Sequence, residues 1–204
     1  ADFLPPYEHP LPLDPRRPVT MGGFGPPYIY PEMKKAQVVN MDAARPVILE
    51  HWAEFAEKFG RQHRPVETYR ADDAEVLLLT MGSTSETARA AVDRMRDAGR
   101  KVGQVSLRLW RPFPFEELRQ AVRGADLLVV VDRAISFGGP GGPYASEVRA
   151  ALYAEEKRPR IAGFVAGLGG RDITVAGFEE MVDRGIQVTE SGGEIEFEMY
   201  GVRE

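Results

Sequence analysis

Cysteine is absent from the 204 residues of this sequence. Its absence excludes disulfide bonds, a zinc site built on thiolates, a cysteine nucleophile, and iron–sulfur clusters held by cysteines of this chain. Any redox metal centre that works with this chain therefore has its ligands elsewhere.

Histidine is scarce as well, and the only three are His9, His51 and His63. No two of them have the spacing of metal ligands, so solvent exposure is the ordinary interpretation and no metal site is predicted. A Gly-x-Ser-x-Gly elbow is also missing, and capping of a helix explains Ser83 better than a role as nucleophile. We therefore predict no catalytic residue in this chain.

Long apolar runs and an excess of positive charge are both missing. No stretch of about 18 apolar residues occurs, and the sequence does not open on a basic segment followed by an apolar one, so neither a transmembrane helix nor a signal peptide is predicted. The formal net charge of −5 leaves no electrostatic footprint for nucleic acid. We expect a cytoplasmic chain with protein or small-molecule partners, and with neither nucleic acid nor membrane among them.

What the sequence does contain is a β/α pattern, clearest in residues 74–112. Residues 75–80 form a short apolar run, which is typical of a strand buried on both sheet faces. Ser83, with a glutamate three residues on, predicts a capping box, and Gly99 predicts a left-handed cap at the end of the same helix. Residues 102–109 predict the second strand of a βαβ unit.

The same alternation continues on both sides of this unit. Apolar spacing predicts a helix that starts at Pro46 and ends at Gly60. The remaining predicted elements are an edge strand over 66–69, a helix over 115–122 with Phe115, Leu118 and Val122 inward, strands over 127–131 and 161–165, a helix over 144–153 opened by Pro143, and a helix capped by Thr174. The sum is about four buried strands and one edge strand in an open, parallel-type sheet with helices on both faces.

Proline marks the division of the chain. Most prolines lie in residues 1–30, and we predict a proline-rich extended connector over 1–45, an α/β domain over 46–185, and a C-terminal arm or strand over 186–204. The connector carries too many large apolar side chains for a solvated linker. It either packs along its own domain or crosses onto a neighbouring domain or subunit. We expect its first residues to come from the middle of a longer protein.

Candidate binding groups follow the predicted strands. The glycine loop 138–142 precedes a helix, where backbone N–H groups can bind phosphate, but its spacing departs from the dinucleotide fingerprint and a structural use is favoured. Asp132 and Arg133 lie at the carboxyl end of a strand, where open α/β sheets bind ligands, although an ion pair or an interface contact is more frequent. Arg111 can fork onto a carboxylate or phosphate, or hold a turn. If any residue contacts a ligand or partner, we predict Arg111, Arg133 or Ser136.

Several motifs, in their order along the chain, resemble the C-terminal part of the alpha subunit of 2-oxoacid:ferredoxin oxidoreductases, the pyruvate:ferredoxin oxidoreductase (pyruvate synthase) family. They are Leu79–Ser83 (LTMGS), Leu107–Pro114 (LRLWRPFP), Val130–Arg133 (VVDR) and Ala166–Asp172 (AGLGGRD), with Phe3–Tyr7 at the entry and Tyr200–Glu204 at the end.

The resemblance implies a transketolase C-terminal-like fold. This is a three-layer α/β/α sandwich with a mostly parallel five-stranded sheet and one antiparallel edge strand, which residues 66–70 would supply. It also implies a non-catalytic structural domain, inactive alone, of an enzyme that decarboxylates pyruvate or a related 2-oxoacid, forms an acyl-coenzyme A and passes electrons to ferredoxin.

The same resemblance assigns thiamine diphosphate, coenzyme A and the iron–sulfur clusters to other domains or subunits, which would be the partners of this chain. Many relatives have a charged residue near Ile135, where this chain has Ala134-Ile135-Ser136-Phe137, so relatives give no guide to ligand contacts there. Two alternatives stay open. One is the equivalent domain of a 2-oxoglutarate or branched-chain 2-oxoacid oxidoreductase, and the other is a free-standing nucleotide-binding α/β module that uses the loop at Gly138.

Overall fold

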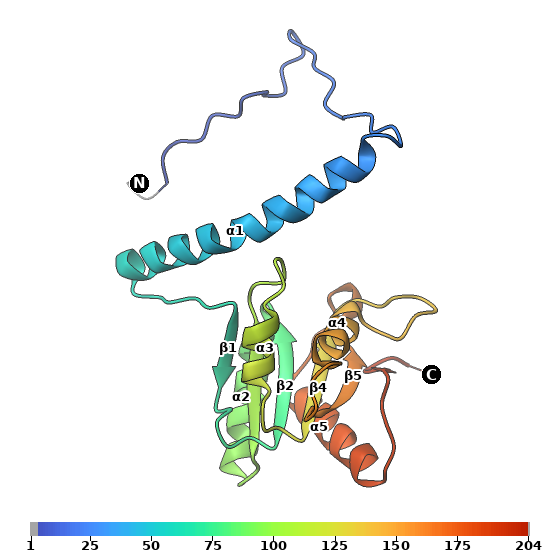
Figure 1. The fold of residues 1–204 in the computed structure, drawn as a ribbon. Helices are drawn as coiled ribbons and strands as arrows, with labels where there is room; N and C mark the ends of the chain where they lie inside the picture. The colour runs from blue at the N-terminus through green and yellow to red at the C-terminus, as the bar shows by residue number, and fades with distance from the viewer. Residues whose placement is uncertain (1–3, 204) are drawn as a thin grey trace. The chain divides into compact units, whose positions relative to one another are not determined.

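The computed structural model describes residues 4–203, and the chain divides between Asp42 and Ala43 into two compact units. The first unit is an extended segment followed by the first turns of helix α1 (Tyr30–Phe59) (Figure 1). Large apolar side chains of this segment are exposed, among them those of Leu13 and Phe24. The predicted extended character therefore holds for the part that precedes α1.

Helix α1 starts at Tyr30, well before the predicted start at Pro46, so the prediction of an extended chain up to residue 45 is wrong. Pro46 lies inside the helix and has no N–H to donate to the carbonyl of Asp42, the last residue of the first unit. The predicted start rested on apolar spacing, which begins only at Ile48. The end of the helix before Gly60 is confirmed.

The second unit contains one six-stranded sheet in the order β1-β3-β2-β4-β5-β6. All neighbouring pairs are parallel except β1 and β3, which are antiparallel. A mostly parallel sheet with one antiparallel edge strand is thus confirmed, with β6 as a strand beyond the expected five. The strands are β1 (Val66–Tyr69), β2 (Val76–Met81), β3 (Val102–Leu107), β4 (Leu127–Asp132), β5 (Arg160–Val165) and β6 (Glu198–Met199).

Helices cover both faces of the sheet, which gives the predicted three layers (Figure 1). One face packs against α2 (Thr84–Asp97) and α5 (Val175–Glu190), and the other against α3 (Phe115–Ala121) and α4 (Pro143–Leu152). Successive strand residues point to opposite faces, so Leu78 faces the first pair of helices and Leu77 the second. Burial on both faces explains why the central strands are continuous apolar runs.

Local signals at three helix ends are confirmed. Thr174 caps α5, because its hydroxyl oxygen accepts a hydrogen bond of 3.0 Å from the Gly177 N–H. Pro143 is the first residue of α4, and Gly99 has the left-handed φ of 80° that the end of α2 requires.

Three other local predictions are wrong. Ser83 has helical backbone angles and its side chain caps nothing; the Thr84 hydroxyl instead donates to the Met81 carbonyl over 2.8 Å. Phe115 is 49% exposed, because its ring lies against Phe113 in the preceding turn, with centroids 4.9 Å apart, rather than in the core. Strand β3 ends at Leu107 and does not continue to residue 109.

The C-terminal segment is attached to its own domain by arginines that bind backbone carbonyls. Arg160 donates to the carbonyls of Thr189 and Gly193, both over 2.9 Å. Arg149 donates to the Glu196 carbonyl over 2.6 Å, and Arg171 binds the Gly201 carbonyl. Helix α5 continues to Glu190, so the predicted domain boundary after residue 185 is wrong. Of the two interpretations that the sequence left open for the C-terminal segment, the structure shows a docked segment that contains a short parallel strand, β6.

Edge strand β1 is held by charges around Glu67, whose side chain is 17% exposed. Arg108 donates two hydrogen bonds to this carboxylate, of 2.7 and 3.1 Å, and His63 and Arg89 approach it at 3.7 and 3.6 Å. Burial favours the neutral acid, but the Arg108 contacts outweigh it and lower the pKa of Glu67 below its ordinary value of 4.5.

A carboxyl whose pKa is lowered by folding stabilises the fold above its unfolded pKa and loses that contribution as the pH falls. We therefore predict that Glu67→Gln lowers the urea midpoint at neutral pH, and that its difference from the native chain shrinks as the pH falls below 4.5. Glu156→Gln is the control, because Glu156 is exposed. A difference that stays constant across this pH range would contradict the assignment.

Candidate functional site

The carboxyl ends of four parallel strands meet at one edge of the sheet, which we call the carboxyl edge: the ends of β2, β3, β4 and β5 and the loops that follow them. The chain passes from β2 to β3 on one side and from β4 to β5 on the other, so the strand order reverses between β2 and β4. Open α/β sheets bind ligands at such a reversal. The predicted candidates Arg111, Arg133 and Ser136 all lie in loops at this edge.

Asp132, the last residue of β4, is the buried carboxylate of the carboxyl edge, at 4% exposure. It accepts hydrogen bonds from the N–H groups of Tyr144 and Ala145, over 2.9 and 3.0 Å. These are second- and third-position donors in the first turn of α4, which otherwise lack partners within the helix. Burial nevertheless raises the pKa of the Asp132 carboxyl above its usual value, since desolvation exceeds the effect of the two bonds.

Gly142 makes this contact possible. A Cβ atom at this position would collide with the Asp132 carboxylate, so only glycine lets the chain pass so near the end of β4. Gly141 has φ of 100°, and a Cβ there would meet the Phe197 side chain at 2.5 Å. The glycine loop therefore has the structural use that its sequence favoured, and the donors that a phosphate would need are already bound to Asp132.

Arg111 is paired within the domain. Its guanidinium forks onto the Glu147 carboxylate of α4, over 2.8 and 2.6 Å, and lies over the Trp110 ring at 4.8 Å. A third hydrogen bond, of 2.8 Å, goes to the Trp110 carbonyl. The two-pronged guanidinium contact that was predicted for a ligand is thus made with a side chain of the same chain.

Arg133 and Ser136 lie in the loop between β4 and α4. The side chain of Arg133 is exposed and has no hydrogen bond or ion pair to the residues that the structure describes. Ser136 closes the loop through its backbone, donating to the Gly141 carbonyl over 2.9 Å and accepting from the Gly139 N–H over 3.0 Å. At the tip of this loop Phe137 is 93% exposed, so the loop presents one cation and one aromatic ring outward.

A group that sequence analysis missed is a buried chain of hydroxyls beneath the first turn of α2. Gln104 Nε2 donates to Thr80 Oγ1 over 2.7 Å, and Ser85 Oγ lies 2.9 Å from both Thr80 Oγ1 and Ser106 Oγ. All four residues are buried. The sequence VGQVSL of β3 carried a signal for this group. Gln104 and Ser106 are two residues apart, so both polar side chains lie on the same face of the buried strand.

His63 lies near the carboxyl end of β3, 3.7 Å from the Glu67 carboxylate that Arg108 binds, whereas His51 lies on α1. His63 packs against Phe55 of α1, with ring centroids 5.5 Å apart, and His51 contacts Glu54 of the same helix at 3.2 Å. Within residues 4–203 no group of three or more histidine, aspartate or glutamate side chains could hold a metal ion. In the same range, no helix combines the length and apolarity that crossing a membrane requires.

Comparison with known proteins places this arrangement among oxidoreductase subunits. Residues 74–178 match the family model described as pyruvate:ferredoxin oxidoreductase core domain II. The chain is 42% identical to pyruvate synthase subunit PorA of Methanothermobacter thermautotrophicus, over 89% of this chain and 46% of that protein. It is 36% identical to ketoisovalerate oxidoreductase subunit VorA of Pyrococcus horikoshii, over 94% of this chain and 49% of that protein.

Among solved structures, the chain aligns with a 2-oxoglutarate:ferredoxin oxidoreductase from Magnetococcus marinus at 22% identity and a TM-score of 0.46, over 65% of this chain and 21% of that one. The chain thus spans about half the length of the curated relatives it matches.

The contact between Asp132 and Gly142 leads to a prediction. Gly142→Ala forces a Cβ into the carboxylate, and overpacking of this kind costs roughly 2 kcal/mol or more of the free energy of unfolding. Gly139→Ala is the matched control, because its Cβ would lie 3.2 Å from the nearest atom, in the Ser136 side chain, and should cost less than about 1 kcal/mol. Urea denaturation measures both values.

A double-mutant cycle makes this test specific. Asp132→Ala removes the group with which the new Cβ collides, so the combined cost of Asp132→Ala and Gly142→Ala should be smaller than the sum of the single costs. Strict additivity, or equal costs for the two glycine substitutions, would show that the carboxylate does not set the requirement for glycine.

Proposed function

Because the chain belongs to the pyruvate:ferredoxin oxidoreductase family, we propose that it is a non-catalytic supporting domain of the alpha subunit of a 2-oxoacid:ferredoxin oxidoreductase. The complete enzyme would decarboxylate a 2-oxoacid, form an acyl-coenzyme A and pass electrons to ferredoxin. Thiamine diphosphate, coenzyme A and the iron–sulfur clusters would be held by other domains or subunits. The chain itself supplies no cysteine ligand.

The observation that supports a non-catalytic role is the internal pairing of polar groups at the carboxyl edge. Asp132 is bound to α4, and Arg111 is bound to Glu147. A diphosphate with its divalent cation needs free carboxylate or carbonyl oxygens and free backbone donors. The residues at this edge do not fit that group, so we assign no step of the reaction to them.

The exposed groups of the same edge suit contact with another polypeptide. Arg133 is a cation without a partner among the described residues, and Phe137 of the same loop is almost fully exposed. Arginine and aromatic residues are enriched at the centres of protein interfaces. We assign this loop, together with the apolar extended segment of residues 4–29, to contacts that position neighbouring domains or subunits around the thiamine site.

Pyruvate is the proposed substrate of the complete enzyme, since two PorA proteins are 42% and 39% identical to the chain, whereas VorA is 36% identical. Similarity to the ketoisovalerate oxidoreductase subunit VorA favours a branched-chain 2-oxoacid as the second candidate. Assays of the complete complex with pyruvate, 2-ketoisovalerate and 2-oxoglutarate would separate them. A cytoplasmic location, with neither membrane nor nucleic-acid partners, remains part of this proposal.

The nucleotide-binding alternative loses its physical basis. It required free N–H groups at the start of α4, and the Tyr144 and Ala145 donors are bound to Asp132. A nucleotide phosphate would have to displace a buried carboxylate that belongs to the same fold.

The supporting role predicts that the isolated chain does not bind thiamine diphosphate. Isothermal calorimetry of the full 204-residue chain with thiamine diphosphate and magnesium should show no saturable heat, while the complete complex should show it. A micromolar dissociation constant for the isolated chain would contradict a purely supporting role.

The proposed interface predicts the effect of Arg133→Ala in the complete complex. Loss of an interfacial guanidinium should weaken association with the remaining subunits about tenfold, as measured by concentration-dependent activity or mass photometry. Arg123→Ala is the matched control, because Arg123 is also exposed but precedes β4, at the opposite end of the strand. Equal effects of the two substitutions would remove Arg133 from the interface.

A further inference from the structure

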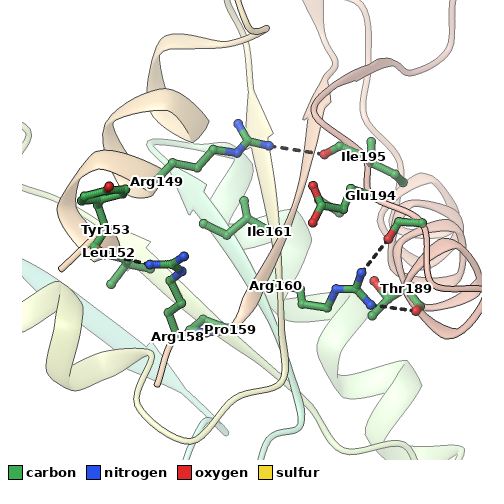
Figure 2. A pocket seen from close by; sticks show the side chains of 12 residues that line it. Arg149, Leu152, Tyr153, Arg158, Pro159, Arg160, Ile161, Thr189, Glu194 and Ile195 are labelled. Carbon is green, nitrogen blue, oxygen red and sulfur yellow. Dashed lines mark hydrogen bonds between the residues drawn. The ribbon is translucent and has the colours of Figure 1, made fainter. Parts of the chain in front are cut away.

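A cavity of about 360 Å³ lies at the amino end of β5, away from the carboxyl edge. It is bounded by the end of α4 on one side and by residues 189–195 on the other, with Ile161 between them (Figure 2). Three arginines, Arg149, Arg158 and Arg160, and a single carboxylate line it. We call it the arginine pocket.

The charge of this pocket is opposite to that of the chain. Three guanidinium groups face one carboxylate, Glu194, in a chain of formal net charge −5. Glu194 points between Arg149 and Arg160 (Figure 2), yet among the described residues it has no ion pair within 4.0 Å. Burial also lowers the pKa of the Arg149 guanidinium, which is the effect expected for a cation without a close counter-ion.

The arginines retain unused donors. A guanidinium has five N–H groups; Arg158 uses one of its nitrogens, for the Tyr153 carbonyl at 2.7 Å. Arg160 uses two nitrogens, for the carbonyls of Thr189 and Gly193. Arg149 Nη1 is buried without any hydrogen-bond partner. A buried donor without a partner costs free energy.

The backbone adds one more free donor. The Arg160 N–H donates toward β4, to the Asp126 carbonyl over 2.9 Å, whereas the Gly163 N–H donates to the opposite side, to the Ile195 carbonyl over 3.2 Å. Direction alternates along a strand, so the Ile161 N–H also points away from β4, toward the pocket. Among the described residues it has no partner on that side.

We propose that the arginine pocket binds a small organic anion through its carboxylate or phosphate oxygens. The oxygens would accept hydrogen bonds from Arg158 and Arg160 and from the Ile161 N–H, and they would neutralise the excess of positive charge. The negative charge of Glu194 repels an anionic ligand and so keeps the affinity of the pocket low. An added peptide strand is disfavoured because residues 189–195 close the space beside Ile161. This inference does not depend on the proposed function, which concerns the other end of the sheet.

Binding can be followed on the full 204-residue chain by amide NMR. Inorganic phosphate, pyrophosphate and succinate are titrated separately at constant ionic strength, and each binding anion should shift the Ile161 amide along a saturable curve. The order of affinities among the three tells whether phosphate or carboxylate oxygens are preferred.

Four substitutions test the assignment. Arg158→Gln, which in the free chain loses one backbone hydrogen bond and a contact with the Tyr153 ring, should weaken binding about tenfold, and Arg158→Lys should recover part of the affinity. Glu194→Gln should tighten binding several-fold. Arg61→Gln, with the same change of charge at an exposed site away from the pocket, should leave the dissociation constant unchanged within about twofold.

The proposal is overturned if the shifts are linear in anion concentration or spread over the whole surface. It is also overturned if Arg158→Gln and Arg61→Gln have equal effects, or if Glu194→Gln does not strengthen binding, because general charge screening would then explain the result. Amide spectra of the free variants confirm that each is folded before titration.

Discussion

The contact between the Asp132 carboxylate and the first turn of α4 determines how the carboxyl edge is built. It places a negative charge against the positive end of a helix, in the middle of the sheet. Because the buried carboxylate leaves no room for a Cβ atom where the chain passes it, the residue at position 142 must be glycine. The same contact uses the donors that a phosphate would need, so the edge where related α/β folds bind ligands is here filled by the protein itself.

The two ends of the sheet therefore differ in what they offer to other molecules. At the carboxyl edge the polar groups are largely paired within the domain, and the exposed remainder, Arg133 and Phe137, suits a protein partner. At the amino end of β5, guanidinium groups with unused donors surround a cavity. The proposed supporting role and the proposed anion site therefore lie at opposite ends of the sheet.

Sequence patterns predicted the sheet well because buried parallel strands are apolar runs that need no partner to be recognised. The start of α1 at Tyr30 was missed, since no residue of α1 is buried and no apolar face marks its first half. Asp132 and Gly142 were both singled out from the sequence, but their contact depends on a tertiary approach that spacing does not encode. The buried hydrogen bond from Gln104 to Thr80 was missed for the same reason, because the two residues are 24 positions apart in the sequence.

The most direct test of this account is an NMR titration of the Tyr144 and Ala145 amides from neutral pH down to about pH 3. If Asp132 accepts from both groups, the two amide resonances should move together with one apparent pKa, and that pKa should lie above the ordinary value of 3.8. Amides that do not respond to pH, or that report a midpoint below 3.8, would contradict the claim that a buried carboxylate closes the carboxyl edge of this domain.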